Sequence, residues 1–382
     1  MTSERHPVRR GERRSWGTWL AFVAVISLVA ACGGGEGAPS PTTAQPGSPA
    51  STDVAAGSPS ATGQATAGAS PVGTAAQTPV ATGETDGQTP GGPAPEIPTI
   101  RLGVLPLADV APVHIAIADG IFENEGLTVE PTIVQGGAAA IPALVSGDLD
   151  ITFGNYVSFF LAVSQAIDLR LIAEQDRATP GFSSIMTLPD SGIADAAGLE
   201  GRQLAVNTLR NVAEITSRAQ IADAAGDPNA VEYVELPFPD MVAALERSDV
   251  DAIFGVEPFV TLARQQLDAV EVANPYGGRL EGFPVAGFQA ATQFTEQNPN
   301  TIAAFQRAMV RASQLAADDP DRVVQILPEY TELTPELAAT LTQPQYISEI
   351  DVSQLQRVVD LMVEFELLEE ASDVASLVIP TP

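Results

Sequence analysis

Four aspartates stand in two pairs that could do acid–base chemistry, Asp148 with Asp150 and Asp249 with Asp251. Paired carboxylates can hold unequal pKa values, so that one serves as an acid and the other as a base. Each pair, however, follows an apolar-periodic helix and precedes a short apolar run, which is the position of a turn. Aspartates commonly cap such turns, so the sequence favours a structural role for all four.

The two pairs belong to a stretch of chain that occurs twice. Ala143–Asn155 reads ALVSGDLDITFGN, and Ala244–Val256 reads ALERSDVDAIFGV. Each copy predicts a helix, a turn and a buried strand that runs into a glycine. In open α/β sheets, ligands bind beyond the carboxyl ends of the strands. The repeat therefore predicts two lobes whose loops face each other across one cleft.

Polar side chains that directly follow the two repeated strands are candidate ligand-binding residues. Asn155 and Tyr156 follow the first strand, and Glu257 follows the second. Glu257 precedes a proline, which restricts its backbone, and we expect its carboxylate to bind a cationic nitrogen of the ligand. The alternative is a surface carboxylate that only ends the strand.

Backbone N–H groups near the same cleft could bind an anionic or polar group. Gly136 and Gly137 follow a strand predicted at Thr132–Val134 and precede the first repeated helix. A tight turn without a ligand is the alternative. Asn211 stands at the N-cap position of a later helix, with Glu214 at N3. An anion site here, together with a cation site at the carboxylate before the proline, favours a zwitterion or an amine-bearing heterocycle over nitrate.

Three loop residues complete the candidate site. Asp109 lies in the loop after a strand predicted at Ile100–Leu105, and Phe238 opens the second repeated helix. Arg210 precedes the N-cap of a lobe 2 helix, although a solvated loop cation is the alternative. These loops are expected to face the cleft.

The first hundred residues differ from the rest of the chain. Several arginines precede an apolar run, Trp19–Ala31, which is typical of a secretory signal. The run ends LVAAC and resembles the bacterial lipobox, so we expect Cys32, the only cysteine, to be lipidated. Its alternative is an ordinary cysteine in an uncleaved anchor. We therefore assign residues 1–31 to a signal peptide and 32–97 to the lipidated cysteine and a disordered tether.

The charge of the chain argues against nucleic acid as a partner. The formal net charge is −30, and the sequence contains no lysine. Binding to phosphate backbones requires clustered basic residues. The acidity is instead consistent with a solvated, soluble surface.

Several motifs in succession resemble one family. Residues 120–130 read GIFENEGLTVE, 135–137 read QGG, 147–150 read GDLD and 251–258 read DAIFGVEP. They resemble the ABC-transporter substrate-binding proteins for nitrate, sulfonates, taurine and thiamine-pyrimidine precursors. The resemblance runs from about Ile100 to the carboxyl end. It implies an α/β fold, the type 2 periplasmic-binding-protein clamshell, in which two lobes with mostly parallel, helix-flanked sheets are joined by a double crossover.

The resemblance also implies domains and a function. We expect lobe 1 at residues 98–188 and 286–382, the second part with C-terminal helices, and lobe 2 at 189–285. The chain would be a monomeric, lipid-anchored extracytoplasmic protein. It would capture a sulfonate- or taurine-like zwitterion or a pyrimidine-type compound and deliver it to an ABC permease and its ATPase. No catalysis, cofactor or metal is expected.

Two alternatives use the same fold. One is a ligand-sensing receptor, and the other is an enzyme similar to pyrimidine-precursor synthases, which spend a histidine on the product. The chain has only His6, in the signal, and His114, which falls within a predicted helix. A packed or surface histidine is favoured for His114, so the sequence favours binding over catalysis.

Overall fold

The computed structural model describes residues 91–370 and 372–382. They belong to one compact unit of the chain, Val80–Pro382. The predicted signal peptide, Cys32 and most of the predicted tether lie outside the described residues. Among the described residues, no helix combines the length and the apolar character needed to cross a membrane.

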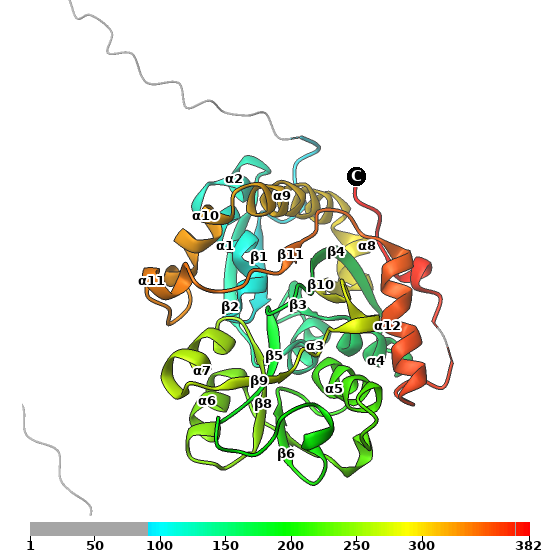
Figure 1. Ribbon diagram of the computed structural model, residues 1–382. Helices are drawn as coiled ribbons and strands as arrows, with labels where there is room; N and C mark the ends of the chain where they lie inside the picture. Colours follow the sequence, from blue (N-terminus) through cyan, green and yellow to red (C-terminus); the bar gives the residue numbers. More distant parts are fainter. Residues whose placement is uncertain (1–90, 371) are drawn as a thin grey trace, which may run out of the picture. The chain divides into compact units, whose positions relative to one another are not determined.

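Lobe 1 is built on a six-stranded mixed sheet in the order β11-β4-β10-β3-β1-β2 (Figure 1). The first three strands in the chain, β1 to β3, are parallel, and β10 runs antiparallel to β3 and β4. Four helices follow or connect these strands. The bounds are β1 Thr99–Val104, α1 Ala111–Ala118, α2 Ile121–Asn124, β2 Thr128–Ile133, α3 Gly137–Ser146, β3 Ile151–Asn155, α4 Tyr156–Ser164, β4 Leu169–Arg177, β10 Pro284–Ala291 and β11 Gln345–Tyr346.

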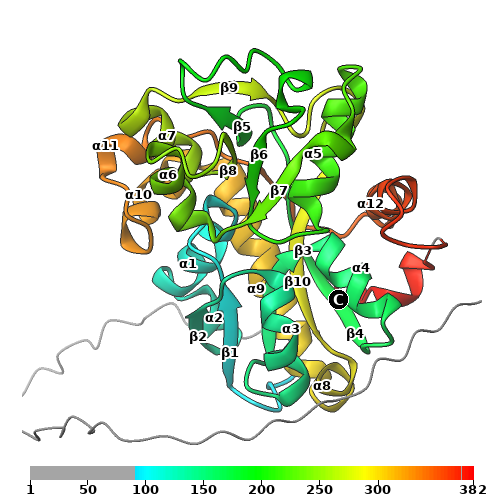
Figure 2. The same cartoon turned by 90° about the horizontal axis from the view of Figure 1, so that it is seen from below.

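Lobe 2 is built on a five-stranded sheet in the order β7-β6-β8-β5-β9. It repeats the plan of lobe 1, because β6, β7 and β8 are parallel while β5 runs antiparallel to β8. Figure 2 shows α5, α6 and α7 beside this sheet. The bounds are β5 Ser183–Thr187, β6 Gln203–Val206, α5 Val212–Asp223, β7 Glu232–Glu235, α6 Phe238–Glu246, β8 Ala252–Val256, α7 Phe259–Leu267 and β9 Val270–Ala273.

The remaining helices follow β10 and pack on lobe 1. Helix α9 contacts α1 and β4, and α12 contacts α4 and β10. Their bounds are α8 Thr292–Gln297, α9 Pro299–Asp318, α10 Pro320–Ile326, α11 Pro335–Ala338 and α12 Val352–Glu364. Short 3-10 helices are η1 Ala108–Val110, η2 Ala197–Leu199, η3 Pro228–Ala230, η4 Gly278–Leu280, η5 Leu327–Glu329 and η6 Val374–Leu377.

The first crossover between the lobes lies earlier than the sequence predicted. Strand β4 ends at Arg177 in the sheet of lobe 1, and β5 begins at Ser183 in the sheet of lobe 2. The boundary placed between residues 188 and 189 was therefore wrong. A short, fully buried strand has the same apolar pattern in either sheet, so its partner could not be read from the sequence. The chain returns to lobe 1 between Ala273 and Pro284.

The fold also begins slightly before the predicted start at residue 98. The Glu96 carboxylate accepts hydrogen bonds from the N–H groups of Asn300 (3.1 Å) and Thr301 (2.8 Å) at the start of α9. The Ile97 N–H donates to the Thr301 hydroxyl at 3.1 Å. A carboxylate at a helix N-terminus satisfies otherwise unpaired N–H groups, so the tether prediction extended too far toward the carboxyl end.

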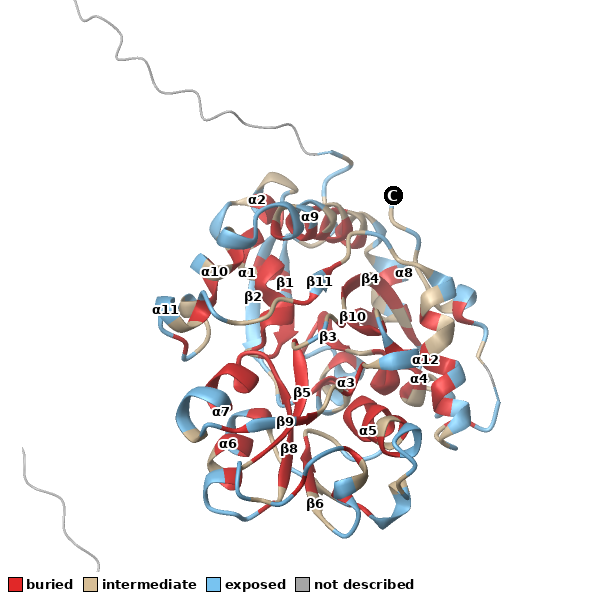
Figure 3. Cartoon of the chain, in the orientation of Figure 1, coloured by how far each residue is buried: buried red, intermediate tan, exposed pale blue. Residues whose placement is uncertain are grey.

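The central strands of both sheets are buried along nearly their whole length (Figure 3). Every residue of β5 and β8 is buried, as are all but the last residue of β3 and β10. Helices cover the faces of such strands, which explains why their sequences are apolar runs without alternation. The strand ends, and the loops that follow them, are left to form a site.

Candidate functional site

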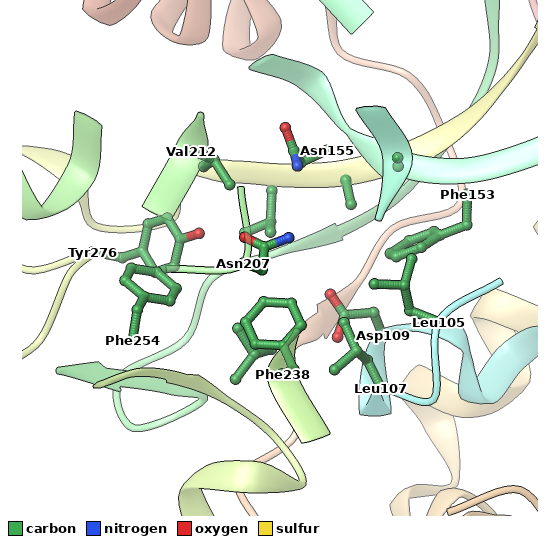
Figure 4. A pocket seen from close by; sticks show the side chains of 15 residues that line it. Leu105, Leu107, Asp109, Phe153, Asn155, Asn207, Val212, Phe238, Phe254 and Tyr276 are labelled. Atoms are coloured by element: carbon green, nitrogen blue, oxygen red, sulfur yellow. The ribbon is translucent and has the colours of Figure 1, made fainter. Parts of the chain in front are cut away.

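A small cavity of about 40 Å³ lies between the two lobes, with walls from both (Figure 4). Lobe 1 contributes Asp109, Gly137, Phe153 and Asn155 among others. Lobe 2 contributes Asn207, Phe238, Phe254 and Tyr276 among others. The space is enough for a few water-sized groups. Phe153 and Phe254 stand at matching positions of the repeat, and both line this cavity.

The aspartates of the repeat do not line this cavity. The Asp150 carboxylate accepts a hydrogen bond from the Arg101 N–H at 2.8 Å, where β1 begins its run beside β3. The Asp251 carboxylate accepts one from the Gln203 N–H at 2.8 Å, at the start of β6. The first aspartate of each pair is exposed. All four thus lie in the turns and not at the cavity, and the second of each pair ties its turn to a neighbouring strand.

The predicted glycine pair lies at the cavity and at the contact between the lobes. A Cβ atom on Gly137 would stand 2.7 Å from the Gly154 Cα, so only glycine lets α3 begin this close to the end of β3. Gly137 lines the cavity. A Cβ atom on Gly136 would reach within 3.6 Å of Asn207 and 3.5 Å of Thr208, both in lobe 2. Gly136 therefore faces the opposite lobe.

Asn155 and Tyr156 follow the same strand and point to different places. Asn155 lines the cavity, and its Oδ1 accepts the Ser158 N–H at 2.9 Å, which caps α4 and leaves the amide nitrogen for other partners. Tyr156 is buried inside lobe 1. A Cβ atom on Gly287 of β10 would stand 2.6 Å from its hydroxyl oxygen. The structure does not place Tyr156 on the cavity wall.

Asn211 connects the lobes, and Arg210 stays outside the cavity. The Asn211 Nδ2 donates to the Ser158 hydroxyl of lobe 1 at 2.8 Å, and its Oδ1 accepts the Val212 N–H at the start of α5. Arg210 is exposed, with its N–H bonded to the Glu214 carboxylate at 2.6 Å. Both residues flank an outer groove. Neither lines the cavity.

Glu257 is buried against its own helix and does not line the cavity. Its carboxylate accepts hydrogen bonds from the Thr261 N–H (3.0 Å), the Thr261 hydroxyl (2.9 Å) and the Thr342 N–H (3.3 Å). Burial raises the pKa of Glu257 to about 6, although the hydrogen bonds from Thr261 oppose this shift. The backbone oxygen of Glu257 accepts the Ala108 N–H of lobe 1 at 3.0 Å. The expectation that its carboxylate faces the ligand was therefore wrong, because Thr261 of α7 and the Thr342 N–H supply its donors.

A buried pair of aspartates at the cavity includes one residue that the sequence did not single out. Asp109 in η1 is 2% exposed and lines the cavity, and Asp176 near the end of β4 is 0% exposed and within hydrogen-bonding reach of it. Burial raises the pKa of Asp109 to about 7. Burial and the charges of Asp109 and Glu174 raise the pKa of Asp176 well above its usual value. The pair thus retains a proton near neutral pH.

The wall from lobe 2 is mainly aromatic. The rings of Phe254 and Tyr276 meet edge to face, with centroids 6.4 Å apart, and Phe238 stands beside them in Figure 4. Sequence reasoning missed Asn207, Phe254 and Tyr276. Asn207 directly follows β6, and Phe254 matches a wall residue in the repeat, so both carried a signal. Tyr276 packs on lobe 2 just after β9, in the segment that leads back to lobe 1, where no pattern distinguishes it.

A histidine that could act as a catalyst lies away from the cavity, and a group of metal ligands is absent from the described ranges. The His114 ring stacks on Tyr330 at 3.8 Å between centroids, and burial lowers its pKa to about 4. It is a packed histidine. Within residues 91–370 and 372–382, no group of three or more His, Cys, Asp and Glu is arranged to hold a metal ion.

Comparisons with known proteins agree with this architecture. The family described as NMT1/THI5 like matches residues 108–323. The taurine-binding periplasmic protein of Escherichia coli (strain K12) is 27% identical over 213 residues, 55% of this chain and 64% of that protein. A putative aliphatic sulfonates-binding protein of Bacillus subtilis (strain 168) is 22% identical over 293 residues, 74% of this chain and 86% of that protein. The chain thus spans less than two thirds of the taurine-binding protein.

Solved structures share the fold. The alkanesulfonate-binding protein SsuA from Xanthomonas axonopodis pv. citri, bound to MOPS, superposes with a TM-score of 0.64 at 18% identity, over 74% of this chain and 99% of that one. The desulfurization enzyme DSZB superposes with a TM-score of 0.56 at 17% identity, over 74% of this chain and 97% of that one. At these identities the likeness shows the fold alone.

Proposed function

The chain belongs to the NMT1/THI5-like family, and we propose that it is an extracytoplasmic solute-binding protein that delivers a small organic molecule to an ABC importer. The observation that carries this proposal is the cavity between two lobes, walled by the loops that follow strands of both sheets. Relatives whose names describe them as periplasmic or sulfonate-binding proteins support it. The candidate solutes are a sulfonate- or taurine-like zwitterion and a pyrimidine-type compound.

Capture in this proposal works by closure of the lobes. Two segments connect the sheets, residues 178–182 and 274–283, and such paired connections allow a hinge motion. In the closed state, the Asn211 amide of lobe 2 donates to the Ser158 hydroxyl of lobe 1. Opening breaks this hydrogen bond and exposes the cavity. A solute that contacts both walls then favours the closed state by its differential affinity for it.

The test of the proposed function is binding of a solute by the full chain. Thermal unfolding would be followed against taurine, alkanesulfonates, nitrate, aminopyrimidines and small amines. A ligand present at about a hundred times its dissociation constant adds about 2.7 kcal/mol to the free energy of unfolding. A positive probe would then be taken to a reconstituted permease and ATPase, where uptake must depend on this chain. Stabilisation by none of these probes would contradict the proposal.

We also propose that the protein is a monomer held at the membrane through lipid on Cys32, a residue outside the described range. The sequence around the cysteine supports this, and the tether would keep the lobes near the permease. Cys32→Ser should leave the folded domain intact and release it from the membrane fraction, because no other anchor is proposed. Retention of the variant in membranes would contradict lipid anchoring.

A further inference from the structure

The cavity wall has one acidic side chain and no basic one. Among the described residues that line the cavity, Asp109 is the only acid, and none is an arginine or a histidine. The chain has no lysine. A site for an anion such as nitrate or a sulfonate would be expected to place a cation or several free N–H donors at this point. The wall has no cation, and beside amide donors such as Asn155 it presents the carboxyl group of Asp109.

This carboxyl group is short of hydrogen-bond donors. Its Oδ2 is buried and accepts no hydrogen bond from an N–H group or a hydroxyl of the described residues, and only the carboxyl of Asp176 lies within reach. The tyrosines packed around it donate elsewhere, since the Tyr330 hydroxyl donates to the Leu107 carbonyl (3.0 Å) and the Tyr346 hydroxyl to the Ala108 carbonyl (2.9 Å). The Gln175 amide donates to the backbone oxygen of Asp109 at 2.8 Å and not to its carboxylate.

The nearest acidic neighbour adds to this shortage. Both oxygens of Asp176 likewise accept no hydrogen bond from an N–H group or a hydroxyl within the described ranges, so the two carboxyl groups have only each other. Arg177, the next residue in the chain, is engaged with Glu174 at 2.8 Å and lies 3.9 Å from Asp351. An unpaired buried acid costs free energy unless it keeps a proton or meets a cation. The folded protein therefore retains, beside the cavity, an acid pair that a ligand cation would complete.

We propose that the cavity binds a small organic cation, whose protonated nitrogen is bound by the Asp109 carboxylate while its apolar body packs against Phe238, Phe254 and Tyr276. Aromatic rings favour a neighbouring cation through their negative faces. The proposal rests on the proposed function and narrows its ligand class. A zwitterion fits only if its ammonium group is the end that reaches Asp109.

Binding of a cation is linked to proton release in this arrangement. The pair of Asp109 and Asp176 holds a proton in the empty cavity near neutral pH, and the ammonium group replaces it at Asp109. The other titratable groups around the pair are Glu174, Tyr156, Tyr276, Tyr330 and Tyr346, and burial raises the pKa of each. Affinity for a cation should therefore increase as the pH rises through about 7.

The experiment compares two probes with the same body and opposite head groups, propylammonium and propanesulfonate, by calorimetry on the full chain. Propylammonium should bind more tightly at about pH 8 than at about pH 6, with release of protons detected as a dependence of the heat on the buffer. Propanesulfonate should not bind. Asp109→Asn should weaken propylammonium binding by roughly 10- to 100-fold. Asp148→Asn, which removes an exposed acid of the same lobe, is the matched control and should bind as the parent does.

A second variant keeps the ligand-binding carboxylate and tests the pair. The protonated carboxyl of Asp176 donates to Asp109 and lowers the pKa of Asp109. Asp176→Leu removes this donor, so the pH dependence of propylammonium binding should move to higher pH. An unchanged pH profile would contradict the shared proton. This readout remains informative if Asp109→Asn does not fold.

The outcomes separate the ligand class from the proposed function. If propanesulfonate or nitrate binds and propylammonium does not, the cation proposal is overturned and solute binding stands. If Asp109→Asn binds propylammonium as tightly as the parent, the assignment of Asp109 is overturned. If no ammonium, sulfonate, nitrate or aminopyrimidine probe binds, both the cation class and the proposed function fail.

Discussion

In lobe 1 the repeated helix–turn–strand unit is α3 and β3, and in lobe 2 it is α6 and β8. Both copies place a phenylalanine, Phe153 or Phe254, on the cavity wall. The charge, however, comes from lobe 1 through Asp109, whereas lobe 2 adds the rings of Phe238 and Tyr276. The repeat thus supplies the same scaffold twice, and the loops and strand ends around it supply different chemistry.

The turns of the two copies also differ in burial. Asp150 pairs with Arg101 through two side-chain hydrogen bonds, and the side chain of Asp150 is 6% exposed. Asp251 pairs with Arg202 at 3.3 Å, and its side chain is 37% exposed. The second aspartate of the pair is therefore buried in lobe 1, as Asp150, and half-exposed in lobe 2, as Asp251. This asymmetry can be measured.

The largest expected effect is on the pH dependence of stability. The pKa of Asp109 is raised from 3.8 to about 7 on folding. The protonated Asp109 therefore contributes to the free energy of unfolding fully below about pH 4, and this contribution is lost as the pH rises through 7. Asp109→Asn should flatten this loss, which amounts to at most about 1.4 kcal/mol per pH unit for one proton. Denaturant unfolding of the empty protein between pH 4 and pH 8 checks it.

The counterpart in lobe 2 sharpens this prediction. The pKa of Glu257 is raised from 4.5 to about 6. Glu257→Gln should therefore change the pH dependence of the free energy of unfolding over a narrower and more acidic pH range. A slope that is unaffected by Asp109→Asn would show that the acid pair does not retain its proton.

The next effect compares the glycines of the repeat. A Cβ atom on Gly154 would stand 2.9 Å from the Gly137 Cα and 2.6 Å from the Gln289 Nε2, so Gly154→Ala should cost about 3 kcal/mol of stability. A Cβ atom on Gly255 would stand 3.0 Å from the Val260 Cγ2, a side chain that can move, and Gly255→Ala should cost about 1 kcal/mol. Equal costs in chemical denaturation would contradict the closer packing of lobe 1.

The smallest effect compares the aspartates of the turns. Asp150→Ala removes a buried carboxylate that accepts from the Arg101 N–H and from its guanidinium, and should cost about 2 kcal/mol. Asp251→Ala removes a more exposed contact, so water can replace it, and should cost about 1 kcal/mol or less. Unfolding free energies of the two variants provide the check. A larger loss from Asp251→Ala would reverse the comparison.

Much of the fold could be predicted because periodic patterns report it. The repeat indicated two lobes, and the positions after its strands led to Asn155 and, with the loops, to Asp109, Gly137 and Phe238. The directions of side chains could not be predicted in the same way. Tyr156 turns into its own lobe, although it follows the same strand as Asn155.

Two errors have specific physical causes. Glu257 was expected to face the ligand, but Thr261, one helical turn later, supplies donors to its carboxylate. Asp176 was passed over because its partner, Asp109, lies far away in the sequence, and only the sheet brings β4 beside η1. Neither a helix that satisfies a buried acid nor a long-range pairing of two acids leaves a periodic signal.

The most direct test of the account is closure of the lobes on a cation bound at Asp109. In a Cys32→Ser background, cysteines replacing the exposed Val145 of lobe 1 and Leu209 of lobe 2 would carry a fluorescence donor and acceptor. Propylammonium should change the transfer efficiency saturably, with the midpoint found by calorimetry, and the change should be lost in Asp109→Asn. Binding without any change in transfer, or the same change in Asp109→Asn, would contradict the account.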